Sequence, residues 1–211
     1  MTPLTRERTA GLIEAAEARG DRWAVLWRLL VDLGLRIGEA IALTWDDLDL
    51  ERGRVSVAKT LVLHADGPDG APVVNEPKNS HSRRLVPIAP ATVPALRAHR
   101  ARQAADRLAL GPRYAAHGLV FSMAVSTVAR YRRINEALRA TLAAAELPRP
   151  RIHDLRHTAA TLMLATNIPA KIVSERLGHS SIAITLDRYS HVMPGMQEDA
   201  VGRLAAAMGW E

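Results

Sequence analysis

The sequence contains no cysteine, which excludes disulfide bridges, thiolate zinc sites, iron–sulfur clusters and a cysteine nucleophile. Aromatic residues make up 4% of the chain, too few for a face of stacked rings that binds single-stranded nucleic acid. No uncharged apolar run reaches the ~18 residues of a membrane span, and the first residues contain no apolar stretch of signal-peptide length. We therefore expect no membrane partner and a cytoplasmic location.

Lysine is also scarce, because only three of the 28 basic residues are lysines, namely Lys59, Lys78 and Lys171. The remaining basic residues are arginines, whose planar guanidinium groups suit bidentate contacts with phosphate. The formal net charge is +6 and the isoelectric point is near 10.4. This excess predicts a polyanionic partner, and double-stranded DNA is the first expectation.

Helical periodicity dominates the 211 residues, a length that can bury one sizeable core. The apolar spacing predicts helices over 5–20, 21–34 and 37–43, with Arg36 in the tight turn between the last two. A period of two then indicates about three antiparallel strands, at 53–57, 61–63 and 84–87. A brief strand is expected at 118–122, and the later helices are expected at roughly 90–108, 127–145, 153–166, 169–177, 180–188 and 195–208.

These elements predict a mainly α protein with a small three-stranded antiparallel sheet, an α+β fold. We expect one catalytic domain over 1–211, divided into a helical part (1–52), the small sheet (53–88), a helical part with the active site (89–193) and a tail helix (194–211). No internal repeat of 20 to 50 residues is visible, which excludes a solenoid.

Unusual polar residues are concentrated in four segments, each of which has an ordinary explanation when taken alone. Arg36 and Glu39 are spaced as a surface ion pair on a helix, and Lys78 lies in what could be a charged hairpin loop. The four segments are GLRIGEAIAL (34–43), EPKNSHSRRLVPI (76–88), RIHDLRHTAATLML (151–164) and LGHSSIAITLDRYSHV (177–192).

The third segment has the most informative spacing. His153, Arg156 and His157 are placed at i, i+3 and i+4, which puts them on one face of a helix. A zinc site on the two histidines is the alternative, and it would make the chain a metal-dependent nuclease or hydrolase. The segment lacks the glutamate that follows the first histidine in zinc proteases, and no obvious third ligand follows.

Taken together, the four segments give the order Arg, Lys, His-x-x-Arg, His, Tyr on a basic chain. This set, with the long motifs HDLRHTAATLML and LGHSSIAIT-x-D-x-YSHV, resembles the catalytic domain of the tyrosine recombinases, the phage-integrase type of site-specific recombinase. The resemblance extends over essentially the whole chain. It implies cleavage and rejoining of DNA strands without metal, ATP or any other cofactor.

The resemblance also implies the roles of individual residues. Tyr189 would be the nucleophile that forms a 3′-phosphotyrosyl intermediate. Arg36 and Arg156 would clamp the phosphate with their guanidinium groups. His153 would position the phosphate and accept the tyrosine proton, and His179 would donate a hydrogen bond to a phosphate oxygen. Lys78 corresponds to the family's mobile lysine and would be the general acid. Lys59 is the alternative acid, and supporting roles are expected for Glu39, Asp154 and His157.

The implied partners are double-stranded DNA and other recombinase protomers, four of which would assemble in a synapse on nucleoid DNA. The family's usual core-binding domain is not present in these 211 residues, so we expect weak DNA binding by this chain alone. The tail helix could dock on its own chain or on a neighbour. Type IB topoisomerases share the chemistry, and a DNA-binding module without catalysis is the remaining alternative.

Overall fold

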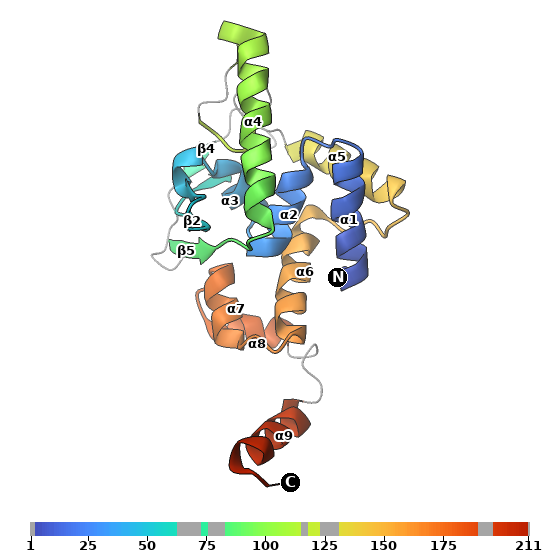
Figure 1. Ribbon diagram of the computed structural model, residues 1–211, viewed down its shortest axis with the longest axis vertical. Helices are drawn as coiled ribbons and strands as arrows, with labels where there is room; N and C mark the ends of the chain where they lie inside the picture. Colours follow the sequence, from blue (N-terminus) through green and yellow to red (C-terminus); the bar gives the residue numbers. More distant parts are fainter. Residues whose placement is uncertain are drawn as a thin grey trace.

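The computed structural model describes residues 3–62, 73–75, 83–114, 118–122, 131–189 and 196–210 (Figure 1). The helices and strands, in chain order, are α1 (Arg6–Ala18), α2 (Ala24–Leu33), α3 (Ile37–Ala42), the 3₁₀ turn η1 (Trp45–Asp47), β1 (Leu48–Asp49), β2 (Arg54–Val57), β3 (Thr60–Val62), β4 (Val73–Asn75), β5 (Arg84–Pro87), α4 (Thr92–Leu110), the 3₁₀ turn η3 (Gly111–Arg113), α5 (Tyr131–Ala144), α6 (Ile152–Ala165), α7 (Ala170–Leu177), α8 (Ile182–Tyr189) and α9 (Met196–Met208).

Helix α2 forms the centre of the core and packs against α1, α4 and α6. Its sequence is apolar around almost its whole circumference, which is typical of a helix surrounded by others. Trp27, Leu30 and Leu33 are each no more than 1% exposed, and full burial of a large apolar side chain contributes roughly 1.5–3 kcal/mol. The helix ends at Gly34, whose φ of 63° is the left-handed conformation typical of a residue that terminates a helix.

The sheet confirms the predicted fold class but not the predicted choice of strands. Strands β1, β2 and β5 form the three-stranded antiparallel sheet, in which Val55 is paired with Val86. The strand predicted near 61–63 is present as β3, but it pairs with β4 in a separate two-stranded ladder. Its expected place is taken by β1, which has only two residues and so shows no alternating pattern in the sequence.

The predicted helices are confirmed to within a few residues wherever the structure describes them. The segment 118–122 forms a single bridge between Thr44 and Leu119 rather than a strand. Figure 1 shows α4 extending beyond the body of the molecule, and α9 standing apart from it. Several apolar side chains of α9 are exposed, namely Val201, Leu204 and Met208.

Candidate active site

The structure brings together four of the residues predicted for the site, from three parts of the chain. Arg36 lies in the turn between α2 and α3, His153 and Arg156 lie on the first two turns of α6, and Tyr189 ends α8. Helix α6 packs against α2, α7 and α8. The contacts of α6 therefore bring segments more than 100 residues apart in sequence into one site.

The Arg36 side chain is held on one side and open on the other. Its backbone N–H and its Nη1 donate to the two carboxylate oxygens of Glu39 at 2.9 and 2.8 Å, an arrangement that also caps α3. Its Nη2 donates to the carbonyl of Gly178 at 3.3 Å. The side chain is nevertheless 42% exposed, so it is oriented and still accessible to a ligand.

Arg156 is 3% exposed, which is unusual for an arginine. Its Nη1 donates to the Gly34 carbonyl at 2.7 Å, whereas its Nη2 is buried and has no hydrogen-bond partner among the described residues. Burial, and then the nearby charge of Arg36, lowers the pKa of Arg156 to about 9. The group is still charged at pH 7, and a buried charged donor without a partner indicates a place for an anion.

The Tyr189 side chain is 3% exposed and lies against α6. Its hydroxyl shares a hydrogen bond of 2.5 Å with Nδ1 of His157. Burial raises the pKa of Tyr189, and the charges of Arg156 and Arg188 oppose that rise. The hydroxyl is therefore protonated at pH 7, and it must lose its proton before it can act as a nucleophile.

Two imidazole rings of α6 lie against each other, and one of them, that of His157, contacts this hydroxyl. The rings of His153 and His157 meet edge to face, with their centroids 4.8 Å apart. Burial lowers the pKa of both, for His157 to about 4, and the neighbouring His153 adds to the effect there. Both rings are neutral at pH 7 and can accept a proton. Sequence motifs predicted only a supporting role for His157, but His157 is the ring that contacts Tyr189.

His179 follows the end of α7 and is oriented by α8. Its Nδ1 shares a hydrogen bond of 2.8 Å with the Thr185 hydroxyl, which leaves Nε2 as the ring nitrogen that could meet a substrate. Burial, and then the charges of Arg156 and Arg36, lowers the pKa of His179 to about 4. Thr185 carried no signal in the sequence, because a hydroxyl inside an apolar helix is more often a structural residue.

The two acidic residues predicted to support the site have different surroundings. Glu39 pairs with Arg36, as described above. Asp154 instead caps the start of α6, where Oδ2 accepts the Arg151 N–H at 2.9 Å and Oδ1 accepts its Nη2 at 3.1 Å. The carboxylate of Asp154 therefore stabilises the helix that carries His153 and Arg156.

Of the two lysines considered as the acid, Lys78 lies outside the described residues. Lys59 is described, and its Nζ lies 3.5 Å from Oδ1 of Asp47, which also caps η1 through its other oxygen. The segment that contains Lys78 is bounded on one side by β4 and on the other by β5. Asn75 of β4 is paired with Thr60 of β3, and β3 packs against α3.

The zinc alternative gains no support from the geometry. Within the described part of the chain, no group of three histidine, aspartate, glutamate or cysteine residues is arranged to hold a metal ion. Instead, the ring of His153 contacts that of His157, which in turn contacts Tyr189.

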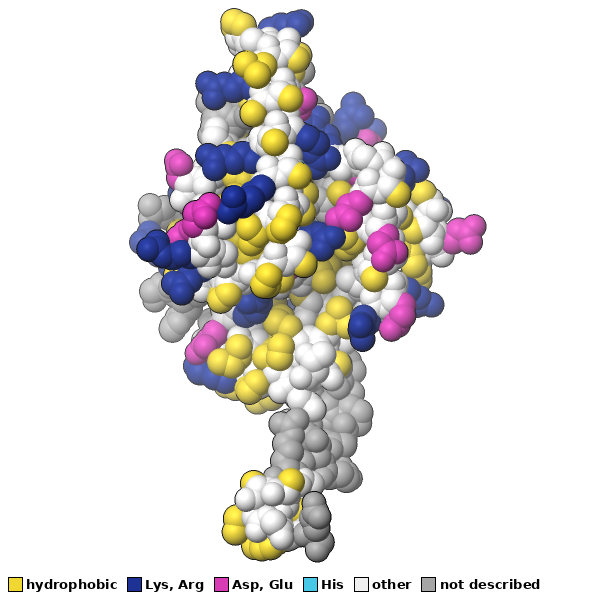
Figure 2. Space-filling view, viewed as in Figure 1, with side chains coloured by type: hydrophobic (Ala, Val, Ile, Leu, Met, Phe, Trp, Pro, Cys, Tyr) yellow, Lys and Arg dark blue, Asp and Glu magenta, His cyan; other side chains and the backbone are white. Residues whose placement is uncertain are grey.

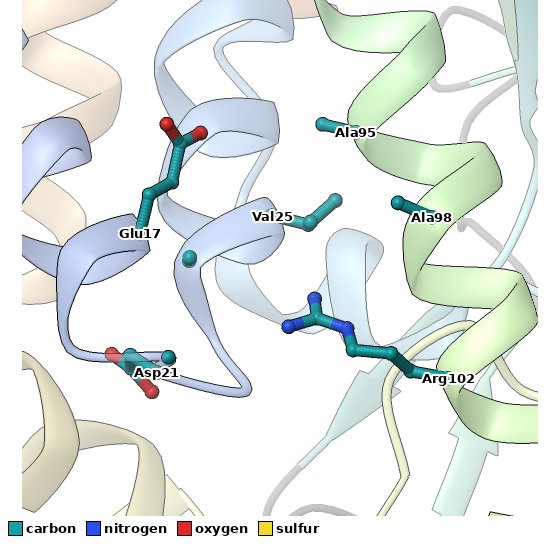
Figure 3. A pocket seen from close by; sticks show the side chains of 8 residues that line it. Glu17, Asp21, Val25, Ala95, Ala98 and Arg102 are labelled. Carbon is teal, nitrogen blue, oxygen red and sulfur yellow. The ribbon is translucent and has the colours of Figure 1, made fainter. Parts of the chain in front are cut away.

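A hollow of about 330 Å³ lies elsewhere, between the α1–α2 turn and α4 (Figure 3). It is lined by none of the predicted site residues. Asp21 in its wall already accepts hydrogen bonds from the Trp23 N–H and the Trp27 indole, which are 2.9 and 3.0 Å away. The polar groups that converge on α6 are therefore the better candidate for a reactive site.

The chain is also similar in sequence to proteins of known family. The chain is 32% identical over 194 residues to a protein named tyrosine recombinase XerC-like from Caldanaerobacter subterraneus, with 88% of this chain and 50% of the relative aligned. It is 30% identical to the ICEBs1 integrase of Bacillus subtilis over 81% of this chain and 45% of that protein. The chain thus spans about half the length of the curated relatives it matches.

Solved structures show the same fold. The Tn1549 transposon integrase, solved in complex with circular intermediate DNA, superposes with a TM-score of 0.76 at 22% identity, covering 97% of this chain and 67% of that one. The catalytic domain of bacteriophage HP1 integrase gives a TM-score of 0.60 at 21% identity, covering 96% and 94%. The family model described as "Phage integrase family" matches residues 3–195, and the chain therefore belongs to the phage integrase family.

Proposed function

We propose that this chain is the catalytic domain of a site-specific DNA recombinase that cleaves and rejoins strands through a 3′-phosphotyrosyl intermediate. The observation that carries the proposal is the buried guanidinium of Arg156. Its Nη2, which has no partner among the residues that the structure describes, lies in the same site as the Tyr189 hydroxyl and the half-exposed Arg36. A phosphate diester between these groups would supply the missing acceptor and would meet the nucleophile.

The reaction is a transesterification, in which each phosphate ester bond that breaks is replaced by a new one. The Tyr189 oxygen attacks the scissile phosphorus, a bond from phosphorus to the tyrosine oxygen forms, and the bond from phosphorus to the 5′ oxygen breaks. The released 5′ hydroxyl of a partner strand then attacks the phosphotyrosine and restores a diester. Because each step replaces one phosphate ester with another, the two steps need no ATP.

Charge stabilisation comes from arginine. In the transition state the two non-bridging oxygens gain negative charge, and Arg36 and Arg156 offer preorganised donors to them. Arg36 is fixed by Glu39 and Gly178, and Arg156 by Gly34. Little reorganisation is then needed at the moment of reaction.

The proton of Tyr189 leaves towards the imidazole pair. His157 holds the hydroxyl in the structure, and the role of His153, by family resemblance, is to accept the proton once the tyrosine turns to the phosphate. The lowered pKa values keep both rings neutral at pH 7, which is the protonation state that a general base requires. His179, oriented by Thr185, would donate its hydrogen bond to a phosphate oxygen.

Lys78 is proposed as the acid that protonates the leaving 5′ oxygen. The strands on either side of its segment are β4 and β5, and both are linked to α3, the helix that Arg36 caps. β4 pairs with β3, which packs on α3, and Arg84 of β5 forms an ion pair with Glu39 of α3. The ion pair of Lys59 with Asp47 supports Lys78 over Lys59.

Double-stranded DNA in the nucleoid is the proposed substrate, bound by several protomers of which four would form a synapse. Figure 2 shows basic side chains along α4, where Arg97, Arg100, Arg102 and Arg107 are exposed. Such charges favour salt-dependent attraction to the phosphate backbone. Within the described residues, no helix is long and apolar enough to span a membrane.

The test uses a pool of nicked duplexes with a randomised central sequence, because a nick traps the covalent intermediate by releasing the strand that would reseal it. Adducts are isolated under denaturing conditions, the modified residue is mapped, and the attached DNA is sequenced. We expect adducts through Tyr189 that form in EDTA and disappear in Tyr189→Phe.

Two results would contradict the proposal. Duplex binding without any adduct would indicate a DNA-binding module. Cleavage that EDTA abolishes and zinc restores would indicate a metal-dependent hydrolase.

A further inference from the structure

Arg84, at the start of β5, is a largely buried arginine to which neither the sequence motifs nor the proposed mechanism gives a role. Its side chain is 8% exposed. Its Nη2 donates to Oε2 of Glu39 at 2.9 Å, and its Nη1 donates to Oε1 at 3.3 Å. Arg84 and Arg36 therefore share one buried carboxylate.

The carboxylate of Glu39 is fully engaged by this arrangement. Oε1 accepts from Nη1 of both arginines, and Oε2 accepts from Nη2 of Arg84 and from the Arg36 backbone N–H. Burial acts to raise the pKa of Glu39, but the hydrogen bond and charge of Arg84, and then the charge of Arg36, hold it below its usual value. Glu39 is thus an anion with two cationic partners.

Arg84 also contacts the end of α7, where the carbonyl of Gly178 orients Arg36. Its Nε donates to the Arg176 carbonyl at 2.9 Å. A Cβ built on Gly178 would lie 2.7 Å from Nη1 of Arg84, so the guanidinium lies directly against this glycine. The carbonyl of Gly178 in turn accepts from Arg36.

We propose that Arg84 is a positioning residue that neutralises Glu39, so that Glu39 can orient Arg36 without cancelling its positive charge towards the phosphate. The proposal rests on the proposed function of the site. With Arg84 in place, the group of Arg36, Arg84 and Glu39 carries a net charge of +1. Without Arg84, the carboxylate is left with Arg36 alone, and that pair has no net charge. The electrostatic attraction for a phosphate dianion or diester falls accordingly.

The test compares Arg84→Gln with the double variant Arg84→Gln/Glu39→Gln. In the single variant the carboxylate neutralises Arg36, and we expect strand cleavage of a duplex selected from the nicked pool to slow about tenfold or more at saturating DNA. In the double variant the carboxylate is gone and the glutamine oxygen can still accept from Arg36, so cleavage should recover several-fold. A purely structural role for Arg84 predicts the opposite, because the second substitution would add to the damage.

Arg54→Gln is the matched control, because Arg54 is an exposed arginine on β2 of the same sheet. A second measurement needs no DNA: inorganic phosphate is titrated while the imidazole signals of His179 are followed by NMR. We expect weaker phosphate binding in Arg84→Gln, recovery in the double variant and no change in Arg54→Gln.

The two proposals fail in different ways. If the unsubstituted chain forms no adduct but binds phosphate in an Arg84-dependent manner, the recombinase function is wrong and the inference about Arg84 holds. If the unsubstituted chain cleaves and Arg84→Gln cleaves equally fast, or if the double variant is slower than the single one, the inference is overturned.

Discussion

Replacement of Gly34 by alanine should destabilise the fold and damage the active site together. Gly34 ends α2 with a φ of 63°, and its carbonyl accepts the 2.7 Å hydrogen bond from Nη1 of Arg156. An alanine here adds a Cβ in the left-handed region, which costs roughly 1–2 kcal/mol. That Cβ would also lie 2.4 Å from Cδ2 of Leu177, a side chain that is fully buried.

The two costs add to a measurable loss. Relief of the contact requires Leu177 to move inside a packed cluster, and such overpacking costs about 1–3 kcal/mol. The reduced entropy of the unfolded chain offsets about 0.5–1 kcal/mol of the total. We expect the free energy of unfolding of Gly34→Ala to fall by about 3 kcal/mol, measured by urea denaturation with helical circular dichroism.

Gly11→Ala is the matched control. Gly11 lies inside α1, and a Cβ there would have no heavy atom within 4 Å. Alanine should stabilise this helix by about 0.5–1 kcal/mol. Equal changes in the free energy of unfolding for the two substitutions would contradict this prediction. So would a Gly34→Ala variant that has the stability of the unsubstituted chain and cleaves DNA at the same rate, because the Arg156 contact would then not depend on this turn.

Three other predictions concern charge and protons. The pKa of His157 is lowered from 6.5 to about 4, so between these values the unfolded chain binds a proton that the folded chain does not. The free energy of unfolding should therefore fall as the pH drops through this window, by on the order of 3 kcal/mol, and urea denaturation at several pH values should show a weaker dependence of that free energy on pH in His157→Gln. Arg156→Lys should cleave at least about 100-fold more slowly at pH 7 and recover partly at lower pH, because the burial that lowers the pKa of Arg156 to about 9 would also lower the pKa of a lysine, which starts from a lower value than that of an arginine; a flat pH–rate profile would contradict this. Lys78→Ala should slow cleavage about 100-fold and be rescued by a 5′-bridging phosphorothiolate, whose sulfur leaves without protonation, whereas Lys59→Ala should stay within about threefold; the reverse pattern would assign the acid to Lys59.

The sequence was sufficient for the helices because their ends carry local signals. Gly34 and Gly178 each end a helix with a positive φ, and the i, i+3, i+4 spacing of His153, Arg156 and His157 is a property of a single helix. The strands were harder to assign, because pairing is a relation between segments. β3 has the alternating pattern of its neighbours, yet nothing local indicates that it pairs with β4 rather than joining β2 and β5.

The contacts that orient the site residues could not be predicted from the sequence, because they too are relations between distant segments. Glu39 and Arg84 are 45 positions apart, and His157 and Tyr189 are 32 positions apart. Motif spacing suggested that Glu39 pairs with Arg36 at i+3, which is a local relation. It gave no indication that a second arginine would share the same carboxylate, because that contact depends on where β5 lies relative to α3 and α7.

The site has to hold its arginines in place without cancelling the positive charge that they offer to a phosphate. A guanidinium paired with its own carboxylate is well oriented, but it has little net charge to offer a phosphate. The two arginines proposed to clamp the phosphate are held differently. Arg156 is held by a neutral carbonyl, and it is buried with one nitrogen that has no partner among the described residues, which goes with a lowered pKa. Arg36 is held by a carboxylate, and Arg84 supplies the compensating charge. Because a backbone carbonyl carries no net charge, Arg156 needs no second cation, and a compensating arginine is required only where the orienting group is an anion.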